Sequence, residues 1–511
     1  MEYFSHPWIN EKAIEKRDYQ EHILKTAVTG NTLCVLPTGL GKTSIAALVA
    51  ASCLEKDMHK KILFMAPTKP LVDQHRTSFE RMMKIGPDEL KTVTGSDKPE
   101  DRKELYEKAD VVFSTPQTIE NDIKNGTLSL RNFSLCIFDE AHRCIGNYAY
   151  TYIAKRYIES ASDPMILALT ASPGGDIKRI NDVKSLLFID NVEIRTRDDP
   201  DVKKYIQKMD QEYVTVELPK AIRSIIDYLA AVKNERMTRL MRWRIISYGK
   251  LSKTQILELQ QKLMKKKTGI NMAAVSVLSE IIKVDHAMML AETQCLASLQ
   301  SYFFKIEQDK EKTRAVARLL ADKNFQDAMR LTSELLKENQ EHPKIEKLLD
   351  LVAGQLAQEK FSKIIVFAQF RDTVAEIARQ IAKIGGAAPV EFIGQAKKKG
   401  KGLSQKEQTQ ILNEFKMGFY NVLCASQVAE EGLDVVETSL VVFYEPTPSA
   451  IRKIQRSGRT ARTQEGKVVI LITKDTRDEA YHWSSHNKER KMQRTLSGMQ
   501  HGLGRFGMAG R

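Results

Sequence analysis

Cysteine is scarce in this chain and is never paired at metal-binding spacing. The 511 residues include six cysteines with no C-x-x-C pair among them, which excludes the usual zinc cage and a disulfide framework. Three of them, Cys34, Cys136 and Cys424, lie within apolar runs. We expect these thiols to be buried and reduced, as in a cytoplasmic protein.

Long apolar runs are missing as well. The longest, residues 45–54, is about half of the roughly 20 residues that an α-helix needs to cross a bilayer. The first residues, Met-Glu-Tyr-Phe-Ser-His-Pro-Trp, contain no basic segment followed by an apolar one, as a secretion signal would. The sequence predicts a soluble protein without a membrane partner.

Proline is absent from residues 220–342, and glycine occurs there only at positions 249 and 269. Strong helix formers dominate this stretch, so we predict an insertion of four antiparallel helices bracketed by Pro219 and Pro343. Residues 221–340 hold 21 Lys and Arg against 13 Asp and Glu, and they supply eight of the net +14 charges of the chain. This excess predicts a polyanionic partner, although charge runs are more often only a solvated helix face.

Short apolar segments alternate with helical patterns on both sides of this stretch. Strand-like runs occur at residues 31–36, 62–66, 111–114, 135–138 and 166–169, and again at 364–368, 421–424, 440–443 and 467–472. Such alternation is typical of parallel sheets with crossover helices. We predict an α/β protein with a first α/β unit at 1–206, a helical insertion at 207–343, a second α/β unit at 344–486 and a basic tail at 487–511.

Residues 36–43 read Leu-Pro-Thr-Gly-Leu-Gly-Lys-Thr, between a strand-like run and a helical pattern. Glycines let backbone amides approach a polyphosphate closely, and the following helix adds its positive end. The segment departs from the usual G-x-x-x-x-G-K-T pattern in having Leu36 at the first glycine position. The residues expected to bind ATP are Thr38, Gly39, Gly41, Lys42 and Thr43, with Thr43 also a Mg²⁺ ligand. The alternative interpretation is an ordinary strand-to-helix turn.

Residues 139–142 read Asp-Glu-Ala-His and follow a strand-like run, which places them at the carboxyl end of a strand. Asp139 is expected to hold Mg²⁺, and Glu140 to act as the general base toward the attacking water. His142 either couples the nucleotide site to movement or caps a helix. A surface acidic pair is the alternative interpretation here.

Residues 455–462 read Gln-Arg-Ser-Gly-Arg-Thr-Ala-Arg. Gln455, Arg459 and Arg462 fall at i, i+4 and i+7, on one face of a helix. Arginines aimed at a γ-phosphate stabilise the charge that develops during phosphoryl transfer. Because they lie more than 400 positions beyond Lys42, we predict a composite ATP site between the two α/β units. Taken alone, this segment would fit a solvated basic helix face.

Together, these motifs resemble those of the superfamily 2 helicases. Residues 17–20 look like their adenine-reading Q motif, 66–70 like motif Ia, 94–95 and 115–117 like motif Ib, 170–172 like motif III and 425–434 like motif V. Motif V has Ser426-Gln427 where relatives commonly have Thr-Ser, and motif VI has Ala461 where glycine is usual. Segments 146–150, 392–396, 402–408 and 478–481 further resemble the archaeal Hef helicase and the eukaryotic Fanconi anaemia group M translocase.

This resemblance covers residues 15 to about 492. It implies two RecA-like parallel-sheet motor domains with an all-α insertion, using ATP and Mg²⁺ to remodel stalled forks and branched or Holliday-type DNA in repair. It also implies a cytoplasmic, nucleoid-associated archaeal protein, with a sliding clamp or a nuclease as a protein partner.

Residue roles follow from the same resemblance. It assigns Arg17 and Gln20 to adenine, Gly432 and Asp434 to the nucleotide site, and His142, Thr170 and Ser172 to coupling. It assigns contacts with the DNA backbone to Lys69, Thr94, Thr115, Gln369, Arg371 and Ser426. Charge in the insertion adds Arg242, Trp243, Arg244, Lys265, Lys266 and Lys267 as candidate nucleic-acid contacts.

Two other functions remain open. Duplex-RNA sensors and Dicer also resemble this layout, so an RNA-dependent ATPase is the alternative, and motifs that contact phosphates do not separate the two polymers. A nucleic-acid-binding scaffold with an inactive motor is less favoured. Inactive motors usually lose their catalytic residues, whereas Lys42, Asp139, Glu140, Arg459 and Arg462 are all present.

Overall fold

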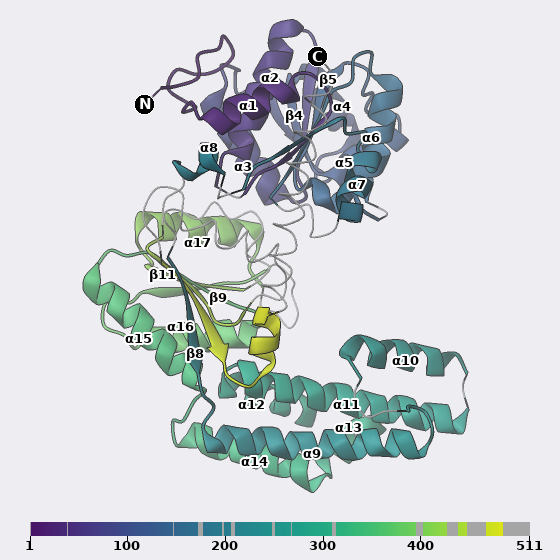
Figure 1. Ribbon diagram of the computed structural model, residues 1–511, viewed down its shortest axis with the longest axis vertical. Helices are drawn as coiled ribbons and strands as arrows, with labels where there is room; N and C mark the ends of the chain where they lie inside the picture. The colour runs from purple at the N-terminus through teal and green to yellow at the C-terminus, as the bar shows by residue number, and fades with distance from the viewer. Residues whose placement is uncertain are drawn as a thin grey trace.

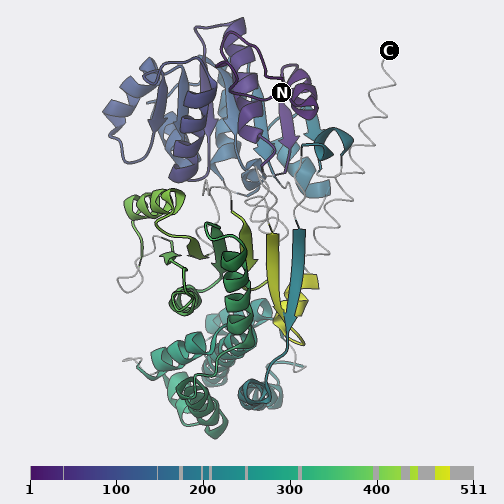
Figure 2. The same ribbon diagram turned by 90° about the vertical axis from the view of Figure 1, so that its left-hand side faces the viewer.

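Two parallel sheets and a helical bundle follow one another along the long axis of this computed structural model (Figures 1 and 2). The first α/β unit lies at one end, the second in the middle, and the bundle at the far end. The structure describes residues 2–37, 39–146, 148–171, 177–196, 199–205, 210–247, 251–266, 268–308, 313–394, 402–426, 438–446 and 467–483.

The first sheet has seven parallel strands in the order β3-β4-β2-β5-β6-β1-β7. Its strands are β1 Thr32–Val35, β2 Lys61–Met65, β3 Leu90–Val93, β4 Val111–Ser114, β5 Phe133–Phe138, β6 Ile166–Thr170 and β7 Asn191–Ile194. Alternate residues of each central strand join one of two hydrophobic clusters, with Phe64 and Phe113 in one and Met65 and Phe138 in the other. Helices cover both faces, so the central strands are mostly apolar.

Except for α1, which precedes β1, the helices of this unit come after its strands in the sequence. They are α1 Asp18–Ala27, α2 Lys42–Lys56, α3 Lys69–Met82, α4 Pro99–Lys108, α5 Pro116–Lys124, the 3₁₀ helix η1 Ala141–Cys144, α6 Ala149–Ser160, α7 Ile177–Leu186 and α8 Pro200–Lys203. Four of the α-helices, α3, α4, α5 and α8, carry proline in their first turn, where its missing N–H costs nothing and its fixed φ suits a helix.

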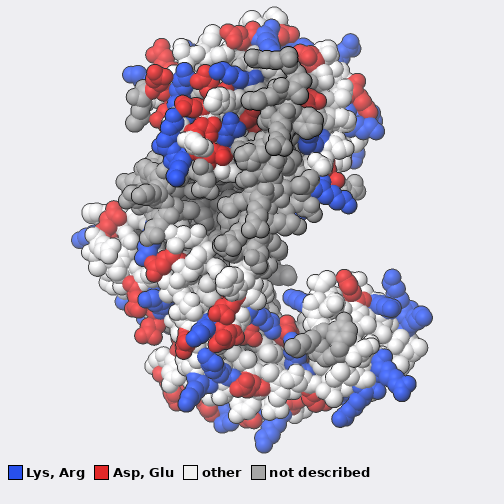
Figure 3. All heavy atoms as spheres, in the orientation of Figure 1, with Lys and Arg blue, Asp and Glu red and all other residues white. Residues whose placement is uncertain are grey.

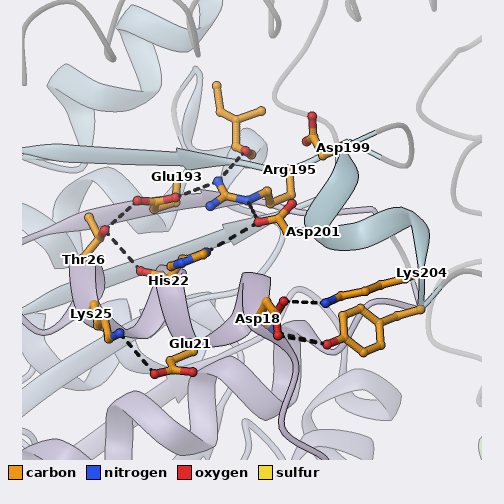
Figure 4. Close-up of polar contacts among 12 residues, drawn as sticks. Asp18, Glu21, His22, Lys25, Thr26, Glu193, Arg195, Asp199, Asp201 and Lys204 are labelled. Atoms are coloured by element: carbon orange, nitrogen blue, oxygen red, sulfur yellow. Dashed lines mark hydrogen bonds and ion pairs between the residues drawn. The ribbon is translucent and has the colours of Figure 1, made fainter.

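The chain leaves the first unit beside its first helix (Figure 4). Arg195, just after β7, pairs with Glu193 at 3.0 Å and with Asp201 of α8 at 2.8 Å. Asp18 of α1 binds Lys204 at 2.5 Å and accepts a hydrogen bond from the Tyr205 hydroxyl at 3.1 Å. These contacts fix α8 against α1.

The second sheet has six parallel strands in the order β10-β11-β9-β12-β13-β8. Its strands are β8 Asp210–Val216, β9 Ile364–Ala368, β10 Pro389–Phe392, β11 Val422–Ser426, β12 Leu440–Phe443 and β13 Lys467–Thr473. The described helices of this unit include α15 Pro343–Gln358, α16 Arg371–Ile381 and α17 Gln405–Met417, and residues 477–483 are helical as well. Both units are therefore α/β, as the alternation of strands and helices predicts.

The start of the insertion differs from the expected boundary at 207. β8, at Asp210–Val216, pairs along its whole length with β13 and forms one edge of the second sheet. Its sequence, Asp-Gln-Glu-Tyr-Val-Thr-Val, is mostly polar, and the side chains of residues 211–216 are half-buried or exposed. The helical part of the insertion begins only at Lys220, and the second unit takes one strand from before it.

Between residues 220 and 337, the described part of the insertion has six helices rather than four. They are α9 Lys220–Arg242, α10 Lys253–Lys265, α11 Gly269–Thr293, α12 Leu296–Glu307, α13 Arg314–Leu320 and α14 Lys323–Lys337. The additional breaks need neither proline nor glycine, because Cys295, Thr313 and Asp322 occupy N-cap positions, and the Thr313 and Asp322 side chains accept backbone hydrogen bonds there. A count based on proline and glycine alone misses such boundaries.

A buried polar seam joins the insertion to the second unit. The Gln294 side chain, between α11 and α12, accepts a hydrogen bond from the Thr373 hydroxyl at 2.9 Å and donates one to Glu445 at 3.4 Å. Lys344, at the start of α15, is fully buried, pairs with Asp478 and donates to the Thr293 carbonyl at 3.1 Å. The seam gives the root of the insertion a fixed place on the second sheet.

Two expectations from composition concern the whole molecule. All six cysteines are buried and free, which confirms the expectation for Cys34, Cys136 and Cys424. Within the described ranges, no helix is both long and apolar enough to cross a membrane.

The seam predicts a specific stability effect. Lys344→Met leaves the Asp478 carboxylate buried without its cation and is expected to lower the free energy of unfolding of the second unit by about 3–5 kcal/mol. The exposed Lys337→Met is the matched control, with an expected change below about 0.5 kcal/mol. Urea unfolding followed by circular dichroism measures both, and equal stability of the two variants would contradict this account.

Candidate nucleotide and nucleic-acid sites

The phosphate loop connects β1 to α2 through two left-handed glycines. Gly39 has φ 89° and Gly41 has φ 81°, both in the region that side chains with a Cβ avoid. A Cβ on Gly41 would also lie 2.5 Å from the Gln20 Nε2 atom. The left-handed backbone therefore favours glycine at position 41, whereas the Gln20 side chain is flexible and can shift. Gly41 also forms the N-cap of α2, whose amide end is suited to anions.

Helix α1, which carries the Q motif, contacts the phosphate loop through hydrogen bonds to one backbone carbonyl. The Tyr19 hydroxyl donates to the Leu40 carbonyl at 2.8 Å, and the Gln20 Nε2 atom donates to the same oxygen at 3.3 Å. The Gln20 Oε1 atom is buried and has no partner among the described residues. Arg17 pairs with Glu15 at 2.9 Å. A buried acceptor without a described partner therefore lies at a residue that the resemblance assigns to adenine.

Lys42 and Thr43 begin α2 and point toward different neighbours. The Lys42 ammonium donates to the Leu36 carbonyl at 3.1 Å, next to the end of β1. The Thr43 hydroxyl lies 3.3 Å from Nδ1 of His75, a residue of α3. Thr38, the remaining expected ligand in this loop, lies outside the described residues.

Asp139 stands at the carboxyl end of β5, two strands from β1. Its Oδ2 atom lies 3.1 Å from His75 Nε2, and the Tyr150 hydroxyl donates to its backbone carbonyl at 2.6 Å. Burial raises the pKa of the Asp139 carboxyl, but His75 and Lys42 outweigh burial and hold that pKa below its usual range. The carboxylate is thus ionised and close to the phosphate loop.

The next residues of the motif turn sharply. Glu140 adopts a left-handed conformation with φ 51°, which is uncommon for a residue other than glycine and is found at functional sites. His142 in η1 lies 3.3 Å from the Glu140 carboxylate and 3.1 Å from the Thr170 hydroxyl at the end of β6. The structure therefore brings His142 and Thr170 together, while Ser172 lies outside the described residues.

Three candidate nucleic-acid residues lie at the carboxyl ends of the neighbouring strands of the first sheet. Lys69 begins α3 after β2, Thr94 follows β3 and Thr115 follows β4. The Thr94 hydroxyl donates to Asp97 at 3.0 Å, and the Thr115 hydroxyl contacts that of Thr118 at 2.9 Å. Because β3, β4 and β2 are neighbours, these residues form a row beside the nucleotide motifs of β5, β6 and β1.

The second unit contributes three more candidates at the carboxyl ends of its strands. Gln369 is exposed after β9, and Arg371 at the start of α16 donates to the Gly394 carbonyl at 2.8 Å. Ser426 ends β11, which pairs with β9, and its side chain is buried. The other expected residues of this unit, Gly432, Asp434, Gln455, Arg459 and Arg462, lie outside the described residues.

The insertion extends a basic arm, formed by the end of α9, by α10 and by the first half of α11 around its own apolar cluster. In Figure 1 α10 lies alongside the first half of α11 at the outer end of the bundle, and Figure 3 shows Lys and Arg along the outer edge of this region. Arg242, Arg244, Lys265 and Lys266 are exposed there. Trp243 is half-buried in the cluster, and the Arg239 guanidinium covers its ring at 5.0 Å. Lys267 lies outside the described residues.

Sequence reasoning missed His75, which touches both expected Mg²⁺ ligands. The sequence contained a signal for this residue, because Val72, His75 and Phe79 occupy the buried face of α3 at i, i+3 and i+7. A polar side chain at such a position needs hydrogen-bond partners. The pattern could therefore have marked His75 as a residue with a partner in the core.

Three family models match consecutive parts of the chain. They are "DEAD/DEAH box helicase" at residues 17–180, "Putative ATP-dependent RNA helicase, helical bundle" at 218–340 and "Helicase conserved C-terminal domain" at 343–464. These matches coincide with the first unit, the helical insertion and the second unit.

Individual relatives give the same assignment. The solved helicase domain of Pyrococcus furiosus Hef is 39% identical, with a TM-score of 0.73, and the match covers 94% of this chain and 100% of that domain. A Methanocaldococcus jannaschii "Putative ATP-dependent RNA helicase" is 40% identical over 97% of this chain and 63% of its own length. The Schizosaccharomyces pombe "ATP-dependent DNA helicase fml1" is 32% identical over 91% of this chain and 58% of its own length.

Vertebrate relatives are much longer than this chain. The mouse "Fanconi anemia group M protein homolog" is 31% identical over 94% of this chain, which spans only 26% of that protein. With its phosphate loop, its Asp-Glu-Ala-His segment and its two parallel sheets in place, the chain belongs to the Hef and Fanconi anaemia group M family of superfamily 2, DEAD/DEAH box ATP-dependent helicases.

Proposed function

We propose that this helicase uses ATP·Mg²⁺ hydrolysis to move along DNA backbones and to remodel forks and branched duplexes. The observation that carries the proposal is the order of the first sheet, in which β3, β4 and β2 lie beside β5, β6 and β1. Candidate phosphate contacts and nucleotide motifs thereby share one edge. Backbone contacts would give binding that is indifferent to sequence.

The nucleotide site has groups suited to ATP. The unpartnered Gln20 Oε1 atom can accept a hydrogen bond from the amino group of adenine. Lys42 would exchange the Leu36 carbonyl for the β/γ-phosphates. Gln455, Arg459 and Arg462 would complete the site from the second unit, because positive charge is needed where the transferred phosphoryl group develops charge.

The oxygen donors near the loop fit Mg²⁺. Mg²⁺ prefers oxygen ligands and is held in such sites by few protein groups together with phosphates and water. The Thr43 hydroxyl and the ionised Asp139 carboxylate both contact one ring, that of His75, so they lie close together. When bound, Mg²⁺ neutralises charge on the phosphates, while Glu140 would accept the proton of the attacking water.

Helix α3 links the nucleotide site with one of the candidate DNA contacts. Lys69 begins α3, and His75 of the same helix reaches Thr43 and Asp139. A change in the nucleotide site is therefore transmitted through a single rigid element to a candidate DNA contact. This arrangement supports coupling between hydrolysis and grip on the strand.

The basic arm supports a preference for branched substrates. Lys262, Lys265 and Lys266 are exposed on it and can contact phosphates. Met264, Ile270 and Met272 are exposed beside them, and apolar side chains of this kind insert between bases where stacking is interrupted. A site of this composition suits a junction better than an uninterrupted duplex.

The names of the relatives support both DNA and RNA as the substrate. The fission yeast relative is named as a DNA helicase, and the solved relative is Hef. The M. jannaschii relative and the helical-bundle model are named for RNA helicases. These names keep a duplex-RNA-dependent ATPase as the second candidate function.

The assigned roles predict two different failures of ATP turnover. Lys42→Ala removes the phosphate cation and is expected to weaken ATP binding. Glu140→Gln keeps the shape of the side chain and is expected to retain binding while lowering kcat by roughly 10²-fold or more. DNA-stimulated phosphate release and binding of a fluorescent ATP analogue measure both, with Lys56→Ala, at the exposed far end of α2, as control. Unchanged turnover in either variant would refute its role.

Stimulation of ATPase activity distinguishes DNA from RNA as the substrate. We expect fork DNA to stimulate hydrolysis more strongly than duplex RNA of matched length, measured at the same salt concentration because phosphate contacts are salt-dependent. Stimulation by the RNA alone would replace the fork proposal with the RNA-dependent one.

The arm is tested by charge reversal rather than by removing the insertion, whose root is buried on the second unit. The triple variant K262E/K265E/K266E is expected to weaken fork binding and to lower the slope of log affinity against log salt by roughly 0.9 for each phosphate that the arm no longer neutralises. The triple variant K220E/K323E/K337E carries the same charge change elsewhere on the insertion and is the control. Equal fork affinity in the two variants would contradict the role of the arm.

A further inference from the structure

His75 occupies a core position but carries polar atoms at both ends of its ring. The residue is 7% exposed, and its ring packs on Phe64 of β2 at 4.4 Å between centroids with a 32° tilt. The Nδ1 atom meets the Thr43 hydroxyl at 3.3 Å, and the Nε2 atom meets the Asp139 carboxylate at 3.1 Å. One ring therefore bridges the first residues of α2 and the end of β5.

A single tautomer satisfies both contacts. The ionised Asp139 carboxylate only accepts hydrogen bonds, so Nε2 carries the proton that it receives. When Nε2 alone carries a proton, Nδ1 is an acceptor, and the Thr43 hydroxyl donates to it. The Thr43 oxygen keeps its lone pairs for another partner, and the second Asp139 oxygen, Oδ1, is not used by His75.

We propose that His75 is a positioning residue for the Mg²⁺ site, which orients the Thr43 hydroxyl and the Asp139 carboxylate before the nucleotide arrives. This inference rests on the proposed Mg²⁺ role of those two residues. Groups that orient metal ligands through hydrogen bonds typically change metal affinity by 10–100-fold. The bridge thus sets how much Mg²⁺ the helicase needs.

The two contacts can be separated by two conservative substitutions. His75→Asn places an acceptor near the Nδ1 position and can restore the Thr43 contact. His75→Gln reaches the Nε2 position and can restore the Asp139 contact. His75→Ala removes both, and Val72→Ala, an apolar position on the same buried face of α3, is the packing control.

Binding of a fluorescent ATP analogue, titrated with Mg²⁺ without DNA, is the measurement. We expect His75→Ala to raise the Mg²⁺ concentration for half-maximal binding by about tenfold or more, while binding in EDTA stays at the wild-type level. His75→Gln and His75→Asn should each recover part of the difference, and Val72→Ala should match the wild type.

Several results would overturn the proposal. An unchanged Mg²⁺ requirement in His75→Ala refutes the positioning role, and so does an equal shift in Val72→Ala. Loss of nucleotide binding in EDTA for all three His75 variants would show that the residue serves only the fold. If the wild-type protein itself binds the nucleotide independently of Mg²⁺, the metal role of Thr43 and Asp139 fails, and the inference about His75 fails with it.

Discussion

Burial of both faces of each parallel sheet is the constraint on which the rest of the molecule depends. With helices on either side, the central strands are mostly apolar, and polar side chains that serve a ligand gather where the strands end. The phosphate loop follows β1, Asp139 follows β5 and Thr170 ends β6. Strand order therefore decides which chemical groups become neighbours.

The same constraint explains how much of the fold could be predicted from the sequence. Every strand expected from an apolar run is a central strand, namely β1, β2, β4, β5 and β6 in the first sheet and β9, β11, β12 and β13 in the second. The described strands that were missed, β3, β7, β8 and β10, are the edge strands of the two sheets. An edge strand needs fewer apolar residues, so its sequence resembles a loop.

The candidate site was predictable where a local motif carries its chemistry. Gly41, Lys42 and Asp139 were each identified from segments of a few residues, because phosphate binding needs a particular local backbone. His75 and Tyr19 escaped because their partners are distant in sequence, with 64 positions between His75 and Asp139 and 21 between Tyr19 and Leu40. Contacts of this kind depend on the strand order, which no local pattern records.

The insertion divides its polar residues between two tasks. At its root, Gln294 and Thr293 join Lys344 and Asp478 in contacts that water does not reach. On the arm, lysines and arginines remain in solvent. The buried pair of Lys344 and Asp478 favours one docking geometry, since any other arrangement would leave a charge unpaired.

That fixed root makes the insertion a lever. α11 runs for 25 residues from the arm to the seam, which corresponds to about 37 Å at 1.5 Å per residue. If the second unit turned by about 10°, the far end of this helix would travel roughly 6 Å, which is close to two nucleotide steps along a DNA strand. A small rotation between the motor domains would thus become a displacement of useful size at the arm, where the proposed substrate would bind.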